Sequence, residues 1–294
     1  MNNSDSPDCI SEILLSQNTK SKYNFLYEHV ATIFEEDETP CFVQLGRYGD
    51  LLNILPVLRF FSVSLGKKIP CVVHERFSEI FEGVSYVMPI SFEGELVECE
   101  RAVQMAKSDY RHVICTQMYG NASITENLPS FSLTMWQQAG CQHLWHYLPL
   151  IFDRRDLSRE AHLVSEFSRN KPIVLVATNG VSSPFPCTNE LKHYLNVHWG
   201  GLCSIVDLDT VKAHRLYDIL GLMDRAALLL ATDSALLHLG YGAHVPTIGF
   251  TTSVPSPWHG AMPRRHWVAN CRYEHVTASF GLFDAIIEQR LKIG

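Results

Sequence analysis

The sequence predicts an α/β protein made of two halves, each a parallel sheet covered by helices, that face each other across a central cleft. Apolar strand-like runs alternate with helical patterns along most of the 294 residues, as is typical of parallel sheets. Two strand–turn–helix units, at 41–61 and 227–250, also resemble each other. A chain of this length has room for two domains.

The first half is expected to begin after an added N-terminal helical segment at residues 1–39, which ends in an acidic run before Pro40. We place the first domain at 40–151. Its expected strands are 41–45, 69–74 and 112–116, with weaker ones at 86–88 and 148–151, and its expected helices are 51–65, 77–81 and 96–107.

A charged helical stretch at 152–171, which stops at Pro172, is expected to link the two halves. The second domain is placed at 172–277. Its expected strands are 173–177, 203–206, 227–232, 247–250 and 267–269, and its expected helices are 211–222 and 235–242. The segment between Gly180 and Cys203 looks short for a full helix. The C-terminal helix, 278–294, is expected to pack back toward the first domain.

Composition excludes several classes of protein. No run of about 18 apolar residues occurs, and the N-terminus lacks the basic and long apolar regions of a signal peptide. The nine cysteines are scattered without a C-x-x-C pair, so a reducing, cytoplasmic location is expected. Residues 1–150 hold ten Lys and Arg against eighteen Asp and Glu. This balance argues against an extended surface that binds a polyanion.

The first strand–turn–helix unit carries the motif GRYGDLLNILP. Gly46 and Gly49 allow a tight turn with backbone close to a ligand. Asp50 stands at the start of the expected helix, and two interpretations stay open. It is an N-cap, worth about 1 kcal/mol, or a general base directed into the cleft. Pro56 follows one turn into the helix.

The second unit reads LLLATDSALLHLGYGAHVP, in which an apolar strand ends at Asp233 and a helix opens at Ser234 and Ala235. Either Asp233 or Ser234 is an N-cap, or the N–H groups of Ser234 and Ala235 hold a diphosphate with help from the helix dipole. His238 lies one turn further on the same helical face. It is a buried core histidine or a ligand contact.

Taken together, these motifs resemble those of glycosyltransferase family nine, the ADP-heptose heptosyltransferases. The first likeness is a Gly-Asp pair followed by proline, at Gly49, Asp50 and Pro56. The second is the pattern D-[ST]-[GA]-x-x-H with a later proline, which here comprises Asp233, Ser234, Ala235, His238 and Pro246. The resemblance implies the GT-B fold, two Rossmann-like parallel-sheet domains around a cleft.

The resemblance also implies roles for residues. Asp50 corresponds to the family's catalytic base, with Arg47, Tyr48 and Gly49 beside it on the acceptor side. The donor nucleotide is expected at Asp233, Ser234, Ala235 and His238 and at the loop 177–185, which contains Asn179 and Gly180. This loop lacks the basic residue that family members place near the diphosphate, so Arg264, Arg265, Lys192 or Arg47 would have to replace it. Ala235 stands where glycine is more usual.

The expected activity is therefore glycosyl transfer from a nucleoside-diphosphate sugar to an acceptor hydroxyl, inverting, with neither a metal nor another cofactor. The acceptor is a glycan or another molecule that bears a hydroxyl. Three alternatives remain: a transferase that acts on hydroxylated bases of viral DNA, a sugar-nucleotide epimerase, and a non-catalytic nucleotide-sugar-binding protein. A flipped-out base needs an aromatic pocket, for which Tyr48, Tyr119 and Trp136 are the candidate walls.

Overall fold

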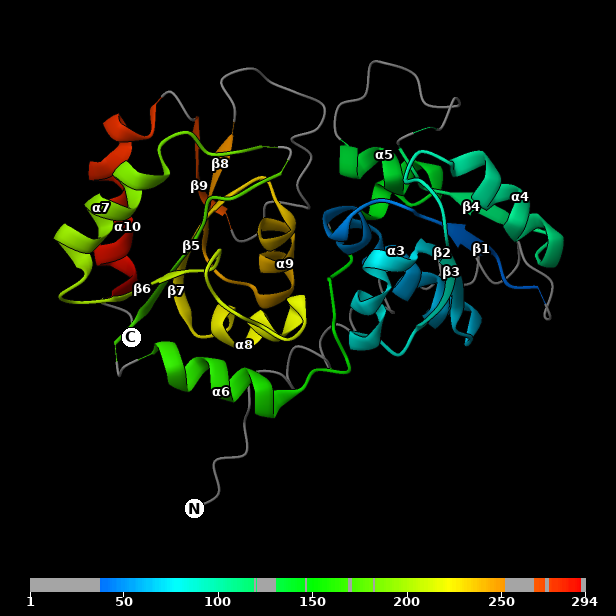
Figure 1. Cartoon of the computed structure of the whole chain (residues 1–294), viewed down its shortest axis with the longest axis horizontal. Coiled ribbons are helices and arrows are strands. Elements are labelled where there is room, and N and C mark those ends of the chain that lie inside the picture. Colours follow the sequence, from blue (N-terminus) through cyan, green and yellow to red (C-terminus); the bar gives the residue numbers. More distant parts are fainter. Residues whose placement is uncertain are drawn as a thin grey trace.

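The computed structural model describes residues 38–118, 120, 131–145, 147–168, 171–181, 183–251, 267–272 and 275–291. Within them the chain forms two separate parallel sheets that lie beside each other, each with its own helices (Figure 1). The predicted pair of parallel-sheet α/β halves is confirmed. The predicted helical segment at 1–39 lies outside the described residues except for its last two.

The first sheet has the strand order β3-β2-β1-β4, with every pair parallel. Its strands are β1 (Cys41–Val43), β2 (Ile69–His74), β3 (Val87–Phe92) and β4 (Val113–Cys115). The helical elements around it are α3 (Tyr48–Leu65), η2 (Glu75–Gly83), α4 (Cys99–Asp109), α5 (Phe131–Gln138) and η3 (Gln142–Leu144). Successive residues of β1 face opposite sides of the sheet, as the period of two requires. Phe42 packs with α3, whereas Cys41 and Val43 pack with α4.

The second sheet has the order β6-β5-β7-β8-β9 and is also entirely parallel. Its strands are β5 (Ile173–Ala177), β6 (Ser204–Asp207), β7 (Ala226–Thr232), β8 (Thr247–Thr251) and β9 (Trp267–Arg272). Its helical elements are α7 (Thr188–Trp199), η4 (Leu216–Ile219), α8 (Leu220–Met223), α9 (Ala235–Ala243), η6 (Thr277–Ser279) and α10 (Phe280–Leu291). Both β5 and β7 are buried over most of their length, which explains their nearly unbroken apolar sequences.

Helices α3 and α9 face each other between the two sheets (Figure 1). Most of α3 is buried, because one side covers the first sheet and another meets α9. A single apolar cluster runs from Phe42 through Leu55 of α3 to Leu239 of α9 and Leu229 of β7. The interface between the halves is therefore part of the core. None of the helices in the described part of the chain has the length and hydropathy of a membrane span.

The connection between the halves is held on both sides. The backbone N–H of Arg154 donates to the Gly83 carbonyl at 3.0 Å in the first half. Phe152 stacks on Tyr217 of η4 in the second half, with ring centroids 5.1 Å apart. Helix α6 (Leu157–Phe167) then packs on α8 so closely that a Cβ on Gly221 would lie 2.5 Å from that of Glu160.

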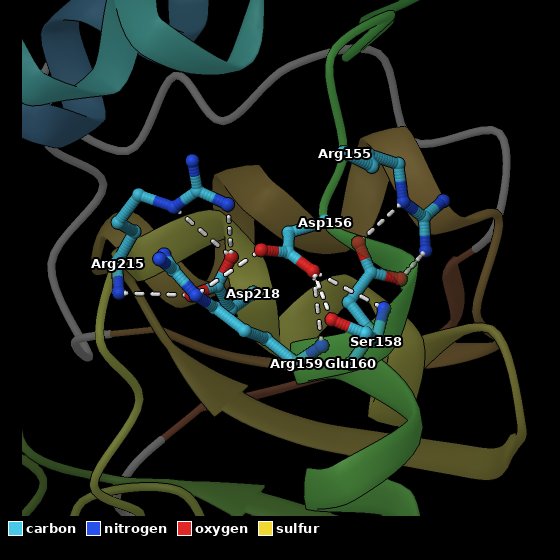
Figure 2. Close-up of polar contacts among 7 residues, drawn as sticks. All are labelled: Arg155, Asp156, Ser158, Arg159, Glu160, Arg215 and Asp218. Carbon is cyan, nitrogen blue, oxygen red and sulfur yellow. Dashed lines mark hydrogen bonds and ion pairs between the residues drawn. The ribbon is translucent and has the colours of Figure 1, made fainter.

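Charged side chains fix the start of α6 (Figure 2). Arg155 bonds Glu160 through two nitrogens and also reaches Asp224 at 2.5 Å. Asp156 caps the helix by accepting from the backbone N–H groups of Ser158 and Arg159, each at 3.1 Å. The Arg155–Glu160 pair is partly buried, whereas the bonds of Asp224 and Asp156 are exposed, so the first pair is the one expected to contribute most to holding the start of α6.

Two expected elements differ from the structure. The residues Leu148–Ile151 form no strand; instead the carbonyls of Leu148 and Ile151 accept from the hydroxyls of Tyr241 and Tyr86, each at 2.8 Å. The segment between Gly180 and Cys203 does contain a full helix, α7. Its buried residues Leu191, Leu195 and Trp199 are four apart, so one face covers the second sheet.

Two expected helices are also corrected. The predicted helix 211–222 is a 3₁₀ turn, η4, followed by the one-turn helix α8. The C-terminal helix α10 lies beside α7 on the side of the second sheet that faces away from the first half (Figure 1). Asp284 of α10 accepts from Tyr194 at 2.5 Å and from the Trp199 indole at 2.7 Å. These bonds attach α10 to the second half, not to the first.

Candidate active site

The turn after β1 is closed by the protein's own side chains. Its three backbone N–H groups bond as follows: Leu45 to Gln117 Oε1 at 3.0 Å, Gly46 to Gln44 Oε1 at 3.0 Å, and Arg47 to Asp50 Oδ2 at 2.9 Å. A Cβ on Gly46 would lie 2.4 Å from Asp50 Oδ2. This residue must therefore be glycine for the carboxylate to fold back over the turn.

Asp50 is not the N-cap of its helix. Helix α3 begins at Tyr48, with Arg47 in extended backbone as the N-cap. Asp50 is the third helical residue and accepts from the Arg47 N–H, the carboxylate half of a capping box. Burial raises the pKa of Asp50 to about 6, although the Arg47 N–H and the charges of His238 and Arg47 oppose the shift. The group is thus ionised at neutral pH and more basic than an ordinary aspartate.

The turn after β7 is open. Ser234 occupies the N-cap position of α9, yet its side chain makes no capping bond. Its Oγ is buried without a partner, and the N–H groups of Ser234 and Ala235 have no acceptor among the residues that the structure describes. Free N–H groups at a helix start are suited to binding an anion.

The neighbouring loop after β5 is occupied. The N–H groups of Thr178 and Asn179 both donate to Asp209 Oδ2, at 3.2 and 3.0 Å. A Cβ on Gly180 would lie 2.8 Å from the Ser183 carbonyl and 3.0 Å from that of Asp233. The loop therefore packs directly against the open turn, while the N–H groups of its first two residues are already bonded.

The two units meet at Gly49 and His238. A Cβ on Gly49 would lie 3.1 Å from His238 Cδ2 and 3.9 Å from the Ala235 Cα. His238 is only 8% exposed. Its Nε2 lies 3.5 Å from Asp233 Oδ1. Asp50, which follows Gly49, is close enough for the charges of His238 and Asp233 to act on its pKa. The fold thus brings the proposed base beside the proposed donor turn.

The candidate cations differ in their availability. Lys192 of α7 is paired with Asp207 at 2.5 Å. Arg264 and Arg265 lie outside the described residues. Arg47 has an exposed side chain at the start of α3, beside Asp50. Of these four candidates, Arg47 is the one that the structure places beside the site.

The aromatic residues considered for a base-binding pocket make other contacts. Tyr48 donates to Glu79 at 2.5 Å and packs edge-on against Phe77. Trp136 is fully buried and donates to the Asn53 carbonyl at 2.7 Å, so it lines no pocket. Tyr119 lies outside the described residues.

Sequence reasoning missed the polar residues that support the site, above all Asn53, which is 2% exposed between α3 and α9. Its signal was present, because a lone amide interrupts the apolar run LLNIL three residues after Asp50. Asp209 and Gln117 could not be identified from the local sequence pattern, since each accepts from backbone N–H groups that are distant in the sequence. Among the described residues, no three His, Cys, Asp or Glu side chains gather as a metal site would.

No protein-family model and no curated protein sequence matches the chain. Solved structures do match. A family 9 glycosyltransferase from Veillonella parvula aligns at 10% identity over 84% of this chain and 89% of its own, with a TM-score of 0.57. E. coli ADP-heptose LPS heptosyltransferase II aligns at 10% identity over 85% of this chain and 99% of its own, with a TM-score of 0.54. E. coli heptosyltransferase WaaC with ADP aligns at 13% identity over 86% and 99%, with a TM-score of 0.54.

The chain has the GT-B fold. At these identities the likeness concerns the arrangement of the two halves and their sheets. It confirms the fold that the two motifs predicted.

Proposed function

We propose that the protein is an inverting glycosyltransferase that moves a sugar from a nucleoside-diphosphate donor to an acceptor hydroxyl. One observation carries the proposal: a basic carboxylate, Asp50, lies beside a helix start whose N–H groups and serine hydroxyl have no partner among the described residues. General-base catalysis needs the first, and binding of a diphosphate leaving group needs the second.

The donor is proposed to bind the second half. Its diphosphate would lie against the N–H groups of Ser234 and Ala235, where the dipole of α9 favours negative charge. The buried Ser234 hydroxyl, which has no partner in the described residues, would donate to a phosphate oxygen. Two E. coli WaaC structures of the same fold were solved with ADP and with ADP-2-deoxy-2-fluoro heptose, which supports this class of ligand.

Asp50 is proposed to act on the acceptor. Its carboxylate removes the proton of the acceptor hydroxyl while that oxygen attacks the anomeric carbon from the face opposite the diphosphate. The bond from the anomeric carbon to the diphosphate breaks, and the nucleoside diphosphate leaves with the electron pair. Because one displacement occurs, the configuration at the anomeric carbon inverts.

Arg47 is proposed to balance the charge of the leaving group in place of a metal. Arg47 is the exposed N-cap residue of α3, and its charge acts on the pKa of Asp50. A guanidinium binds phosphate oxygens through two parallel N–H groups. Arg264 and Arg265 remain further candidates for the same role.

A panel of nucleotide sugars tests the proposal. Binding to the folded state raises the melting temperature, so the true donor should shift it when ADP-, UDP- and GDP-sugars are compared. That donor is then incubated with hydroxyl-bearing acceptors, with and without excess EDTA, and released nucleoside diphosphate is measured. Transfer that needs an acceptor and survives EDTA supports the proposal. Activity that is lost in EDTA and restored by Mg²⁺ contradicts its metal-independent part.

The same assay separates the alternatives. An epimerase would release free sugar without any acceptor, and a binding protein would give the melting shift without turnover. Acceptors should include DNA with hydroxymethylated bases, although Tyr48 and Trp136 already bond to Glu79 and to the Asn53 carbonyl.

A further inference from the structure

Asn53 is a buried amide at the contact between the two halves. It lies in the first turns of α3, three residues after Asp50 and opposite His238 of α9. Its Nδ2 donates to the Gly49 carbonyl at 2.8 Å and lies 3.5 Å from His238 Nδ1. Its Oδ1 is buried and bonds no described residue.

These contacts fix the orientation of the amide. If the side chain were reversed, Oδ1 would face the Gly49 carbonyl, and two acceptors would lie 2.8 Å apart. The nitrogen therefore points to both Gly49 and His238. A purely structural residue at this position would be apolar, since a buried oxygen without a partner is costly. Among the described residues, all of the polar contacts of this side-chain amide are made by its nitrogen.

The direction of this bond determines which ring nitrogen of His238 carries the proton. Because Asn53 Nδ2 is a donor, His238 Nδ1 has to accept, and in the neutral imidazole the hydrogen then resides on Nε2. Nε2 lies 3.5 Å from Asp233 Oδ1, at the end of β7. Among the described residues, the acidic groups that interact with this ring are Asp233 from its own half and Asp50 from α3.

We propose that Asn53 is a positioning residue that holds His238 in its Nε2–H tautomer, so that the ring donates toward Asp233 and the donor turn. A side chain on the acceptor half thereby sets the hydrogen bonding of the donor half. The tautomer follows from the contacts alone; its effect on nucleotide binding rests on the proposed function.

The test compares wild type with Asn53→Leu and Asn53→Asp in full-length protein labelled with ¹⁵N-histidine. Long-range ¹H–¹⁵N spectra distinguish a protonated ring nitrogen from an unprotonated one, and His238→Gln assigns the signals. We expect a protonated Nε2 and an unprotonated Nδ1 in wild type. Asn53→Leu should give a mixture of both tautomers. Asn53→Asp, which presents only acceptors, should move the proton to Nδ1 or charge the ring.

Asn196→Leu is the matched control. Asn196 of α7 makes the same kind of bond, from Nδ2 to the Lys192 carbonyl at 2.8 Å, four residues before it. This variant should leave the His238 signals unchanged. A wild-type Nδ1 that carries the proton, or wild-type tautomer signals in both Asn53 variants, would overturn the proposal.

Calorimetry with ADP, UDP and GDP then measures the consequence. Asn53→Leu should lower the affinity for the nucleotide that binds wild type by roughly three- to tenfold, which is the contribution of about one hydrogen bond. If the spectra behave as expected but no nucleotide binds wild type, the tautomer proposal stands and the proposed function fails. Shifted tautomers with unchanged nucleotide affinity would instead refute the link between them.

Discussion

The turns after β1 and β7 are built from similar sequences and leave their polar groups in opposite states. After β1, three consecutive N–H groups bond to Gln117, Gln44 and Asp50. After β7, the N–H groups of Ser234 and Ala235 and the Ser234 hydroxyl bond nothing among the described residues. The three N–H groups that precede α3 are therefore bonded within the protein, whereas the N-cap N–H and hydroxyl of α9 are free of partners in the described part of the chain.

This difference suits the two proposed roles. A general base has to be held in one orientation, and the Arg47 N–H together with Gly46 holds the Asp50 carboxylate. A binding turn has to keep its donors free of internal partners. A turn that follows a strand of the second sheet does not always keep its N–H groups free. In the loop after β5, two of them donate to Asp209.

The largest expected effect comes from Asp50→Asn in the closed turn. The amide oxygen still accepts from Arg47, so the fold is retained while the base is lost, and transfer should fall by about 10²–10⁴-fold. Single-turnover rates measure this. Asp156→Ala is the control, since Asp156 is a true N-cap of α6 whose side-chain oxygen is removed by this change. It should lose about 1 kcal/mol of stability and keep its transfer rate. Full activity in Asp50→Asn would remove Asp50 from the mechanism.

The closed turn also predicts a pH-dependent gain in stability for the same variant. Because burial raises the pKa of Asp50 from 3.8 to about 6, the folded state binds its proton more tightly than the unfolded state. Wild type therefore loses stability as the pH rises from about 4 to 6. Asn carries no such proton, so Asp50→Asn should be more stable by on the order of 1–3 kcal/mol at pH 7.

Urea unfolding of both proteins at pH 4, 5, 6 and 7 measures that gain. The difference between them should shrink toward the acid end, where Asp50 is protonated in the folded wild type and close to half protonated in the unfolded chain. A constant difference across this range would mean that the Asp50 pKa is not raised.

A smaller effect is expected from Asp233→Ala in the open turn. Loss of the carboxylate that faces His238 Nε2 should weaken nucleoside-diphosphate affinity by roughly tenfold, which corresponds to about 1.4 kcal/mol. Calorimetry with ADP, UDP and GDP checks this value. Unchanged affinity for the nucleotide that binds would place the donor site elsewhere.

The smallest effect on binding is expected from Asp209→Ala, which removes an aspartate in the turn after β6. Its loss breaks the bonds to the N–H groups of Thr178 and Asn179 and should cost about 1 kcal/mol of stability. Nucleotide affinity should change by less than about threefold, because those N–H groups are not free in wild type. A loss as large as that of Asp233→Ala would show that the two turns act as one site.

Local sequence was enough to predict much of the fold. The strands at 69–74 and 173–177 have the expected bounds, because their apolar runs are short and clearly bordered. The order of strand, Gly/Asp turn and helix also identified both units. That Asp50 and Asp233 approach each other did not follow from either motif alone; it depended on the resemblance to two-domain enzymes.

Other features depend on tertiary contacts that local patterns do not contain. The position of α10 is set by Tyr194 and Trp199, some 85 to 90 residues before Asp284. Helix α7 was missed although Leu191, Leu195 and Trp199 repeat every four residues, because the segment between Gly180 and Cys203 looked too short for a full helix. Asp50 was taken for a possible N-cap because its helix was expected to start at Leu51, three residues later than it does.

The apolar cluster that runs through α3 and α9 has a consequence for how the protein unfolds. Leu55 and Leu239 belong to the same cluster as Phe42 of one sheet and Leu229 of the other. Separating the halves would expose that surface to water, at a cost proportional to the apolar area. The two sheets should therefore melt together in one cooperative transition, with equal calorimetric and van't Hoff enthalpies, rather than as two independent domains.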